Sequence, residues 1–325
     1  MRSLVRRRST AYAAAAAIVG SLLCWAAYRL PPPTTSDLDQ LLIAARALFA
    51  GKDPYAVVAH SQYYPLYYPL PAVLLVAPLA VLPTEWARVV WAGIGAAVFS
   101  LAAMRYGRGL AVGMLSASFL HALVLNQWSP ILTAGAVIPW LGLFWVAKPS
   151  VGTAMLAAYP SRGALLGSAL LLLSSFLVEP EWPARWYDAL RSSQHTSPIL
   201  QPGGIILLLA VLRWRRPEAR LLLGLACVPQ TIGLYETLPL FLIPRTRRPA
   251  YVLAVLTYVA AFAQAIVFPR LPGMSLEQNL ANRWPVILGL VYVPALVILF
   301  LQPAAASELT DRPDTTSPWQ EHSPR

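Results

Sequence analysis

Long apolar runs separated by short polar stretches recur along the whole chain. The first covers about 11–28. Because roughly 20 apolar residues cross the core of a bilayer as a helix, this pattern predicts an all-α, polytopic transmembrane helix bundle. The later apolar runs cover 69–83, 86–104, 108–125, 130–147, 151–160, 162–178, 203–212, 221–234, 238–244, 250–268 and 285–302.

Several of these runs are too short to cross a bilayer alone. We expect them to form half-helices or re-entrant pieces, which are tolerated where protein buries them or water lines them. The pattern therefore predicts about ten spans in a single transmembrane domain over 1–303. The polar tail 304–325 is expected to be disordered and cytoplasmic.

A helix is predicted inside the first loop, which covers about 29–68. Ser36 is a good N-cap, Asp39 completes a capping box three residues later, and Gly51 is well placed to end the helix. Apolar residues recur between them at helical spacing. An apolar stripe beside a membrane favours an external juxtamembrane helix that lies in the interface.

Composition and charge support this picture and orient it. The chain is 57% hydrophobic and 12% charged, whereas soluble domains carry about 25% charged residues. The net charge of +11 lies in arginine clusters at 2–8, 213–220 and 245–248, not on one basic face, so we exclude nucleic acid as a partner. Arg-rich short loops are typical of the cytoplasmic side. Both termini are therefore predicted to be cytoplasmic, with a second external loop over about 179–202.

Two alternatives stay open between residues 69 and 160. If 69–83 is a full span, Arg105 and Arg108 face outside, against the positive-inside rule. If it is re-entrant, they face inside. The composition, rich in Ala and Arg with only two lysines, indicates a bacterial chain and hence a multi-pass protein of the plasma membrane.

A set of polar side chains in the predicted external loops, or interrupting apolar runs, could carry chemistry: Asp37, Asp39, Tyr68, Gln127, Lys148, Arg185, Arg191 and His195. Charged groups at membrane depth are functional candidates by default. Plainer explanations exist. Asp37 and Asp39 could serve the helix dipole, Lys148 could extend to the interface, and His195 could be an ordinary loop residue.

Signatures of other chemistries are missing from the sequence. It has no Walker loop, nucleophile elbow or dinucleotide fingerprint. Cys24 and Cys227 are isolated and give neither a disulfide framework nor a zinc site. We therefore predict no resident cofactor and no metal site, although the carboxylates leave a divalent metal open.

Four stretches resemble a known family. Asp37–Tyr55 contains an Asp, an Ala-Arg-Ala-Leu helix and Gly-Lys-Asp-Pro-Tyr, and Tyr68–Pro71 follows. Asn126–Pro130 and Lys148-Pro149 come later in the chain. Together these stretches resemble the polytopic GT-C glycosyltransferases, most of all family 87, which includes the mannosyltransferases of phosphatidylinositol mannoside synthesis.

The resemblance implies a transferase that uses a polyprenyl-phosphate sugar donor on the outer side of the membrane. A lipid, glycan or protein hydroxyl would accept the sugar. Asp37 matches the catalytic position and is the expected general base, with Asp39 as second choice. Lys148 is expected to stabilise the departing phosphate. Weaker candidates for substrate contacts are Gln127, Arg185, Arg191, His195 and Tyr68.

Two other classes of function remain open. A transporter or lipid flippase would fit the short, Pro-interrupted segments. A non-catalytic membrane scaffold would fit the modest length of the chain. The clustering of acidic residues in a predicted external loop favours the enzyme.

Overall fold

The chain is helical throughout the part that the structure describes. A computed structural model describes 2–30, 36–61, 65–193, 195–231, 233–267 and 282–302. Within these ranges the only β pairing is one isolated bridge, between Thr196 and Gln230. The all-α prediction is therefore confirmed for the described residues, and the predicted tail 304–325 lies outside them.

Among the described residues, four helical segments are long and apolar enough to cross a membrane. They are α1 (Arg2–Arg29), α5 (Thr84–Tyr106), α13 (Arg247–Val267) and the continuous segment of α15 (Trp284–Ile287), η6 (Leu288–Tyr292) and α16 (Val293–Leu301). A fifth span results if α10 (Arg162–Val178) and α11 (Trp182–Arg191), which meet at 98°, are counted together.

The prediction of about ten spans is not confirmed, because the other apolar runs fold into short pieces. Proline stands in the first turn of many of them. At that position its missing N–H costs nothing, but the same proline prevents the preceding helix from continuing through it. The pieces are α4 (Leu70–Val76), η1 (Ala77–Val81), α6 (Arg108–Gly113), α7 (Ala117–Val124), α8 (Ser129–Gly135), η2 (Pro139–Ala147), α9 (Pro149–Ala158), η3 (Pro198–Leu200), η4 (Gly204–Arg213), α12 (Pro217–Cys227) and η5 (Leu234–Leu242).

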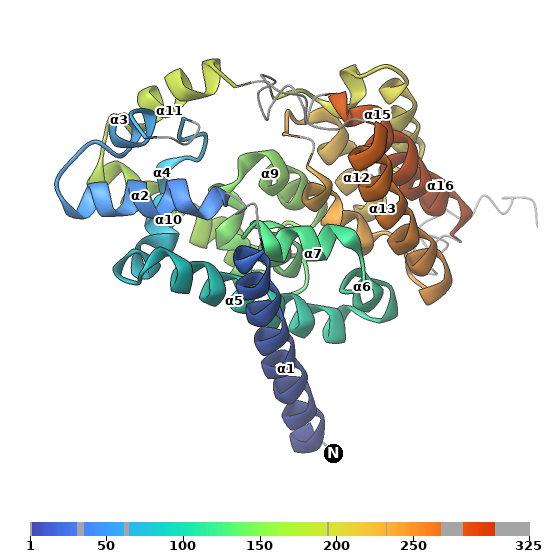
Figure 1. Ribbon diagram of the computed structural model, residues 1–325. Coiled ribbons are helices and arrows are strands. Elements are labelled where there is room, and N and C mark those ends of the chain that lie inside the picture. The colour runs from blue at the N-terminus through green and yellow to red at the C-terminus, as the bar shows by residue number, and fades with distance from the viewer. Residues whose placement is uncertain are drawn as a thin grey trace, which may run out of the picture.

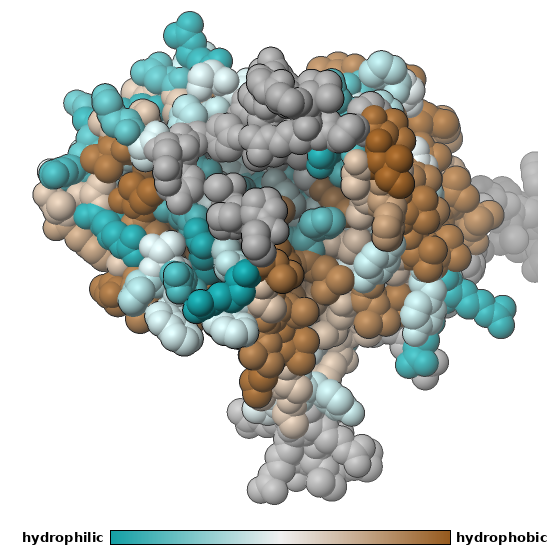
Figure 2. All heavy atoms as spheres, in the orientation of Figure 1, coloured by the Kyte–Doolittle hydropathy of each residue, from teal (hydrophilic) through white to brown (hydrophobic). Residues whose placement is uncertain are grey.

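The long helices lie around these short pieces (Figure 1). Helix α1 packs along α5, and α13 packs against α15, η6 and α16. Hydrophobic residues dominate the surface over α13 and α16, whereas hydrophilic residues gather over α3 (Pro54–Ala59) and α11 (Figure 2). Helix α10 also exposes a row of large apolar side chains, among them Leu166, Leu170 and Leu177. An exposed apolar belt of this kind is what a lipid-facing surface requires.

The predicted helix of the first loop is present as α2 (Asp37–Phe49). Ser36 and Asp39 form the predicted capping box, and Gly51 adopts a left-handed φ of 65° just after the helix ends. Most of α2 is buried against α3, α4, η1 and α5. Its apolar stripe therefore packs on the protein itself, and its external position stays a prediction.

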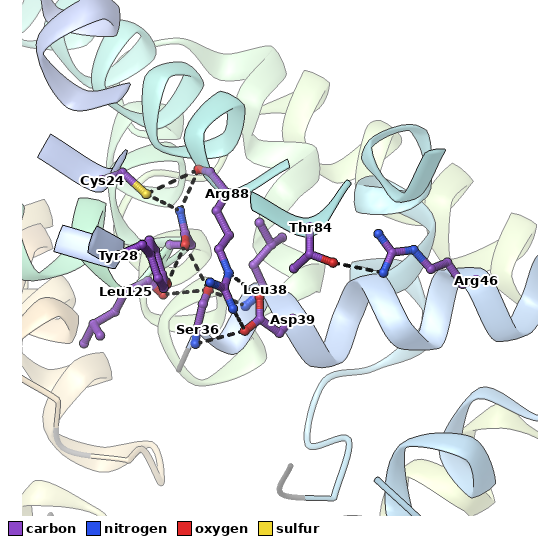
Figure 3. A network of polar contacts seen from close by, with 10 residues as sticks. Cys24, Tyr28, Ser36, Leu38, Asp39, Arg46, Thr84, Arg88 and Leu125 are labelled. Carbon is purple, nitrogen blue, oxygen red and sulfur yellow. Dashed lines mark hydrogen bonds and ion pairs between the residues drawn. The ribbon is translucent and has the colours of Figure 1, made fainter. Parts of the chain in front are cut away.

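The start of α2 is fixed by a buried ion pair (Figure 3). Arg88 of α5 donates from Nε to Asp39 Oδ1 at 2.7 Å, and its second nitrogen contacts Asp39 Oδ2. The Arg88 guanidinium also lies 4.0 Å from the ring centroid of Tyr28 on α1. Asp39 is 1% exposed and the Arg88 side chain 14%, so the pair is largely shielded from solvent and joins three helices.

Asn126, in the turn between α7 and α8, completes the network. Its side-chain oxygen accepts from Ser36 Oγ at 3.0 Å and from Tyr28 OH at 3.2 Å, and its Nδ2 donates to the Arg88 carbonyl at 2.8 Å. Asn126 has a φ of 51°, a left-handed conformation that Gly and Asn adopt most readily. The start of α2 is thereby tied to the loop that carries Gln127.

The other end of α2 is held by Arg46. Its guanidinium donates to the carbonyls of Ala80 and Leu82 and to Thr84 Oγ1, at 2.9–3.0 Å. These acceptors lie where η1 ends and α5 begins. Helix α2 is therefore anchored at both ends, which fixes the direction of its first residue, Asp37.

We predict that Asp39→Asn lowers the free energy of unfolding by about 3 kcal/mol, because it leaves the Arg88 charge without its buried partner. Thermal unfolding in detergent, followed by circular dichroism, measures the change. Asp188→Asn, at an exposed position of α11, is the control and should leave the midpoint unchanged. An unchanged midpoint in Asp39→Asn would contradict the anchoring role.

Candidate functional site

A cavity of about 720 Å³ lies between α2, the 67–68 segment, α9, α11 and the stretch before η5. Its lining mixes carboxylate, ammonium, hydroxyl and aromatic groups. The residues are Asp37, Gln40, Tyr67, Tyr68, Lys148, Pro149, Ser150, Thr153, Trp186, Leu190, Ser193, His195, Val228, Pro229, Thr231 and Tyr235. Segments far apart in the chain therefore meet around one space of ligand size.

Asp37 provides the carboxylate of this cavity. It is half-buried and is the first residue of α2, where the helix dipole favours a negative charge. Tyr68 OH donates to Asp37 Oδ2 at 2.9 Å. Burial, together with the neighbouring Asp37 charge, raises the pKa of Tyr68 well above its usual 10. The phenol therefore stays protonated and keeps donating to Asp37 at neutral pH.

The Asp53-Pro54-Tyr55 stretch positions Tyr68. Asp53 caps α3 by accepting from the backbone N–H groups of Tyr55 and Ala56. This cap fixes the start of α3, and the Tyr55 hydroxyl then donates to the Tyr68 carbonyl at 3.2 Å. The conformation around Tyr68, and with it the bond to Asp37, depends on this short helix.

Lys148 provides the cation. Its Nζ lies 2.9 Å from Glu236 Oε1 and 3.4 Å from Gln127 Oε1, and 4.9 Å from the ring centroid of Tyr235. Lys148 is 8% exposed and Gln127 2% exposed. A cation so far from water needs such partners, and these hold the ammonium group at the cavity wall.

Lys148 stands directly before α9, whose first turn lines the cavity through Pro149, Ser150 and Thr153. In the first turn of α9, Pro149 has no N–H, and the N–H groups of Val151 and Gly152 donate to the Lys148 carbonyl. The dipole of the helix still favours an anion at its start. Close packing on η2 holds the start of α9 at the cavity. A Cβ added to Gly152 would lie 1.9 Å from the Trp145 carbonyl oxygen. Lysine and helix start together make this end of the cavity suited to a negative group.

Glu236 was not indicated by the sequence analysis. It lies in η5 and is 1% exposed, and Thr231 Oγ1 donates to its Oε1 at 3.0 Å. The available signal is an acidic residue within an apolar stretch, Leu234–Ile243, which marks a functional candidate in a membrane protein. Its partner Lys148 is distant in sequence, so the pairing itself was not visible.

Aromatic residues form another wall. Trp186 of α11 donates from Nε1 to the Tyr67 carbonyl at 2.9 Å, and the Tyr67 ring meets His195 edge-on at a centroid distance of 5.5 Å. Rings of this kind offer flat, apolar faces with polar edges. The contacts place α11 and the segment around His195 on the same side of the cavity as Tyr67.

The predicted site residues divide into two groups. Asp37, Tyr68, Lys148 and His195 line the cavity, and Gln127 bonds to one of them. Three others do not line it. Asp39 is occupied by the helix cap and Arg88. Arg185 pairs with Asp53, Glu179 and Glu181, and Arg191 is exposed at the end of α11.

The described residues contain no group of three or more His, Cys, Asp or Glu side chains placed to hold a metal ion. The cavity lining includes the Asp37 carboxylate and the Lys148 ammonium group. A comparison of the chain with known protein families, curated proteins and solved structures finds no match.

Proposed function

We propose that this chain is a membrane glycosyltransferase of the GT-C type. It would transfer a sugar from a polyprenyl-phosphate donor to a hydroxyl of a lipid, glycan or protein on the extracytoplasmic face. The observation that carries the proposal is that Asp37 and Lys148, from the two motifs of the family resemblance, line one cavity. A base and an anion-stabilising cation at one site are what this chemistry requires.

In the proposed reaction Asp37 accepts the proton of the acceptor hydroxyl. The hydroxyl oxygen forms a bond to the anomeric carbon, and the bond from that carbon to the phosphate oxygen breaks. Polyprenyl phosphate leaves with the bonding electron pair. Lys148 and the start of α9 stabilise the added negative charge. The bond from Tyr68 keeps one Asp37 oxygen occupied, which directs the other toward the acceptor.

The remaining candidates fit secondary roles. Gln127 holds Lys148 in place through its 3.4 Å contact. His195, beside Tyr67 in the wall, is placed to contact a sugar. Arg185 and Arg191 lie outside the lining. If they contact substrate as predicted, they contact the polyprenyl chain or the acceptor.

The proposal includes a topology in a bacterial plasma membrane. The termini are cytoplasmic, and α2, α3 and α11 lie on the outer side. The short apolar helices from α4 to η5 bring the number of passages to about ten. Some of these helices are re-entrant, which is tolerated where protein covers them. The exposed leucines of α10 face lipid and offer a path for the polyprenyl chain.

A transporter is the second candidate, and the buried pair of Lys148 and Glu236 favours it. Paired charges in the interior of a membrane protein often mark an ion or substrate path. Coupled uptake by proteoliposomes, without transfer of sugar, would select this function. A folded protein with neither activity would select the scaffold.

We predict that Asp37→Asn lowers kcat for sugar transfer at least about 100-fold, because the general base is lost. The assay uses purified protein in nanodiscs with a panel of polyprenyl-phosphate sugars and membrane lipid extract. Glu85→Gln, an exposed acid in the first turn of α5, is the matched control and should retain activity. Transfer that survives in Asp37→Asn would exclude Asp37 as the base.

We predict that Tyr68→Phe lowers kcat about tenfold and leaves the unfolding midpoint nearly unchanged, since it removes a hydrogen bond to a charged group. The same transfer assay measures the effect. Tyr106→Phe removes a hydroxyl that bonds to the Leu242 carbonyl outside the cavity lining and should have no effect on kcat. Equal losses in the two variants would show that the bond from Tyr68 to Asp37 has no special role.

A further inference from the structure

The Lys148 ammonium group already has an anion beside it before any ligand binds. Glu236 Oε1 lies 2.9 Å from Lys148 Nζ, and Glu236 is 1% exposed. Glu236 does not line the cavity, but three residues that contact it or its partner do: Lys148, Thr231 and Tyr235. The carboxylate therefore stands directly behind the wall that would receive a phosphate.

The surroundings keep this carboxylate in place. Thr231 donates to Oε1, the atom that also meets Lys148. The second oxygen, Oε2, is buried and meets no hydrogen-bond donor among the residues that the structure describes. Helix η5 packs against α7, α8 and α13. The Glu236 charge is fixed, and Lys148 is its principal compensation.

We propose that Glu236 is an internal competitor anion, which shares Lys148 with the phosphate of the ligand and thereby limits how tightly that phosphate is held. The inference rests on the proposed function, in which Lys148 receives the donor phosphate. It adds a residue and a role that the family resemblance does not supply. Glu236 acts through Lys148 and is a positioning residue.

The competition distinguishes the donor from the product. A polyprenyl-phosphate sugar is a phosphodiester with one negative charge. The polyprenyl phosphate that leaves is a monoester with nearly two charges at neutral pH, because its second pKa is about 6. Repulsion between fixed charges grows with the charge of the ligand. Glu236 therefore disfavours the product more than the donor and promotes product release.

The test measures binding by isothermal titration calorimetry, with the full chain in nanodiscs. Geranyl phosphate stands for the product and its methyl diester for the donor. Lys148→Gln should abolish binding of both probes. Glu236→Gln keeps an acceptor for Lys148 and removes only the charge. It should tighten binding of the monoester about tenfold and of the diester about threefold, in line with the Coulomb argument.

Glu218→Gln is the matched control. Glu218 is a buried carboxylate that pairs with Arg245 at 3.1 Å, and its Oε2 also meets no donor within the described ranges. It does not line the cavity. Removing the Glu218 charge should change the affinity for neither the monoester nor the diester. A general effect of removing a buried charge would instead appear in both Glu218→Gln and Glu236→Gln.

The wild type supplies a second measurement that needs no variant to fold. With Glu236 in place, the monoester should bind no more tightly than the diester, although a lysine without a competitor would prefer the more highly charged ligand. A wild-type preference for the monoester overturns the inference. So does binding in a folded Glu236→Gln protein that is equal to or weaker than that of the wild type.

The outcomes separate this inference from the proposed function. If binding depends on Lys148 but not on Glu236, the competitor role fails and the transferase proposal stands. If the wild type binds neither probe, both the phosphate-binding role of Lys148 and the inference fail. In the transfer assay, added geranyl phosphate should inhibit Glu236→Gln about tenfold more strongly than the wild type, which a merely structural role would not produce.

Discussion

The buried ion pair between Arg88 and Asp39 is the interaction on which the candidate site depends. Successive residues of an α-helix turn by about 100°, so Asp37 and Asp39 point in nearly opposite directions. With Asp39 held by Arg88 and by the cap at Ser36, Asp37 is directed to the other side of α2, where the cavity lies. Two carboxylates in one helical turn therefore have different roles: Asp39 holds the scaffold together, and Asp37 lies in the cavity wall.

The distribution of proline explains which parts of the fold could be predicted. The runs that form α1, α5 and α10 contain no proline. The predictions for α5 and α10 agree with the helices nearly to their ends, whereas α1 begins at Arg2, before the predicted start at about 11, and ends at Arg29. In the last long segment, Pro294 is accommodated by the π-helical turn η6 just before it, which supplies the slack that an interior proline needs. Elsewhere prolines divide apolar runs into short helices. Hydropathy alone counts such runs as spans, because it records composition and not the breaks.

The site was predictable where local chemistry determined it. The helix start with its cap could be read from Ser36 and Asp39, and Lys148 was conspicuous as a lysine in an apolar region. The pairing of Lys148 with Glu236, and that of Arg185 with Asp53, depend on tertiary contacts between distant segments. No periodicity carries that information. Tyr68 illustrates the middle case: the sequence marked it as a candidate, but its bond to Asp37 follows only from the turn that Tyr55 fixes.

The charges of the cavity form a consistent system in the proposed reaction. When Asp37 accepts a proton it loses its negative charge, and the departing phosphate gains one at the other end. One unit of negative charge thus moves across the cavity from Asp37 toward Lys148, while the total stays constant. In surroundings of low dielectric this avoids the cost of creating an uncompensated charge. A lysine without a neighbouring anion would hold the newly formed phosphate tightly. Glu236, fixed 2.9 Å from Lys148, repels the phosphate of the product. The arrangement of charges that assists departure of the phosphate from the sugar therefore also assists its release from the protein.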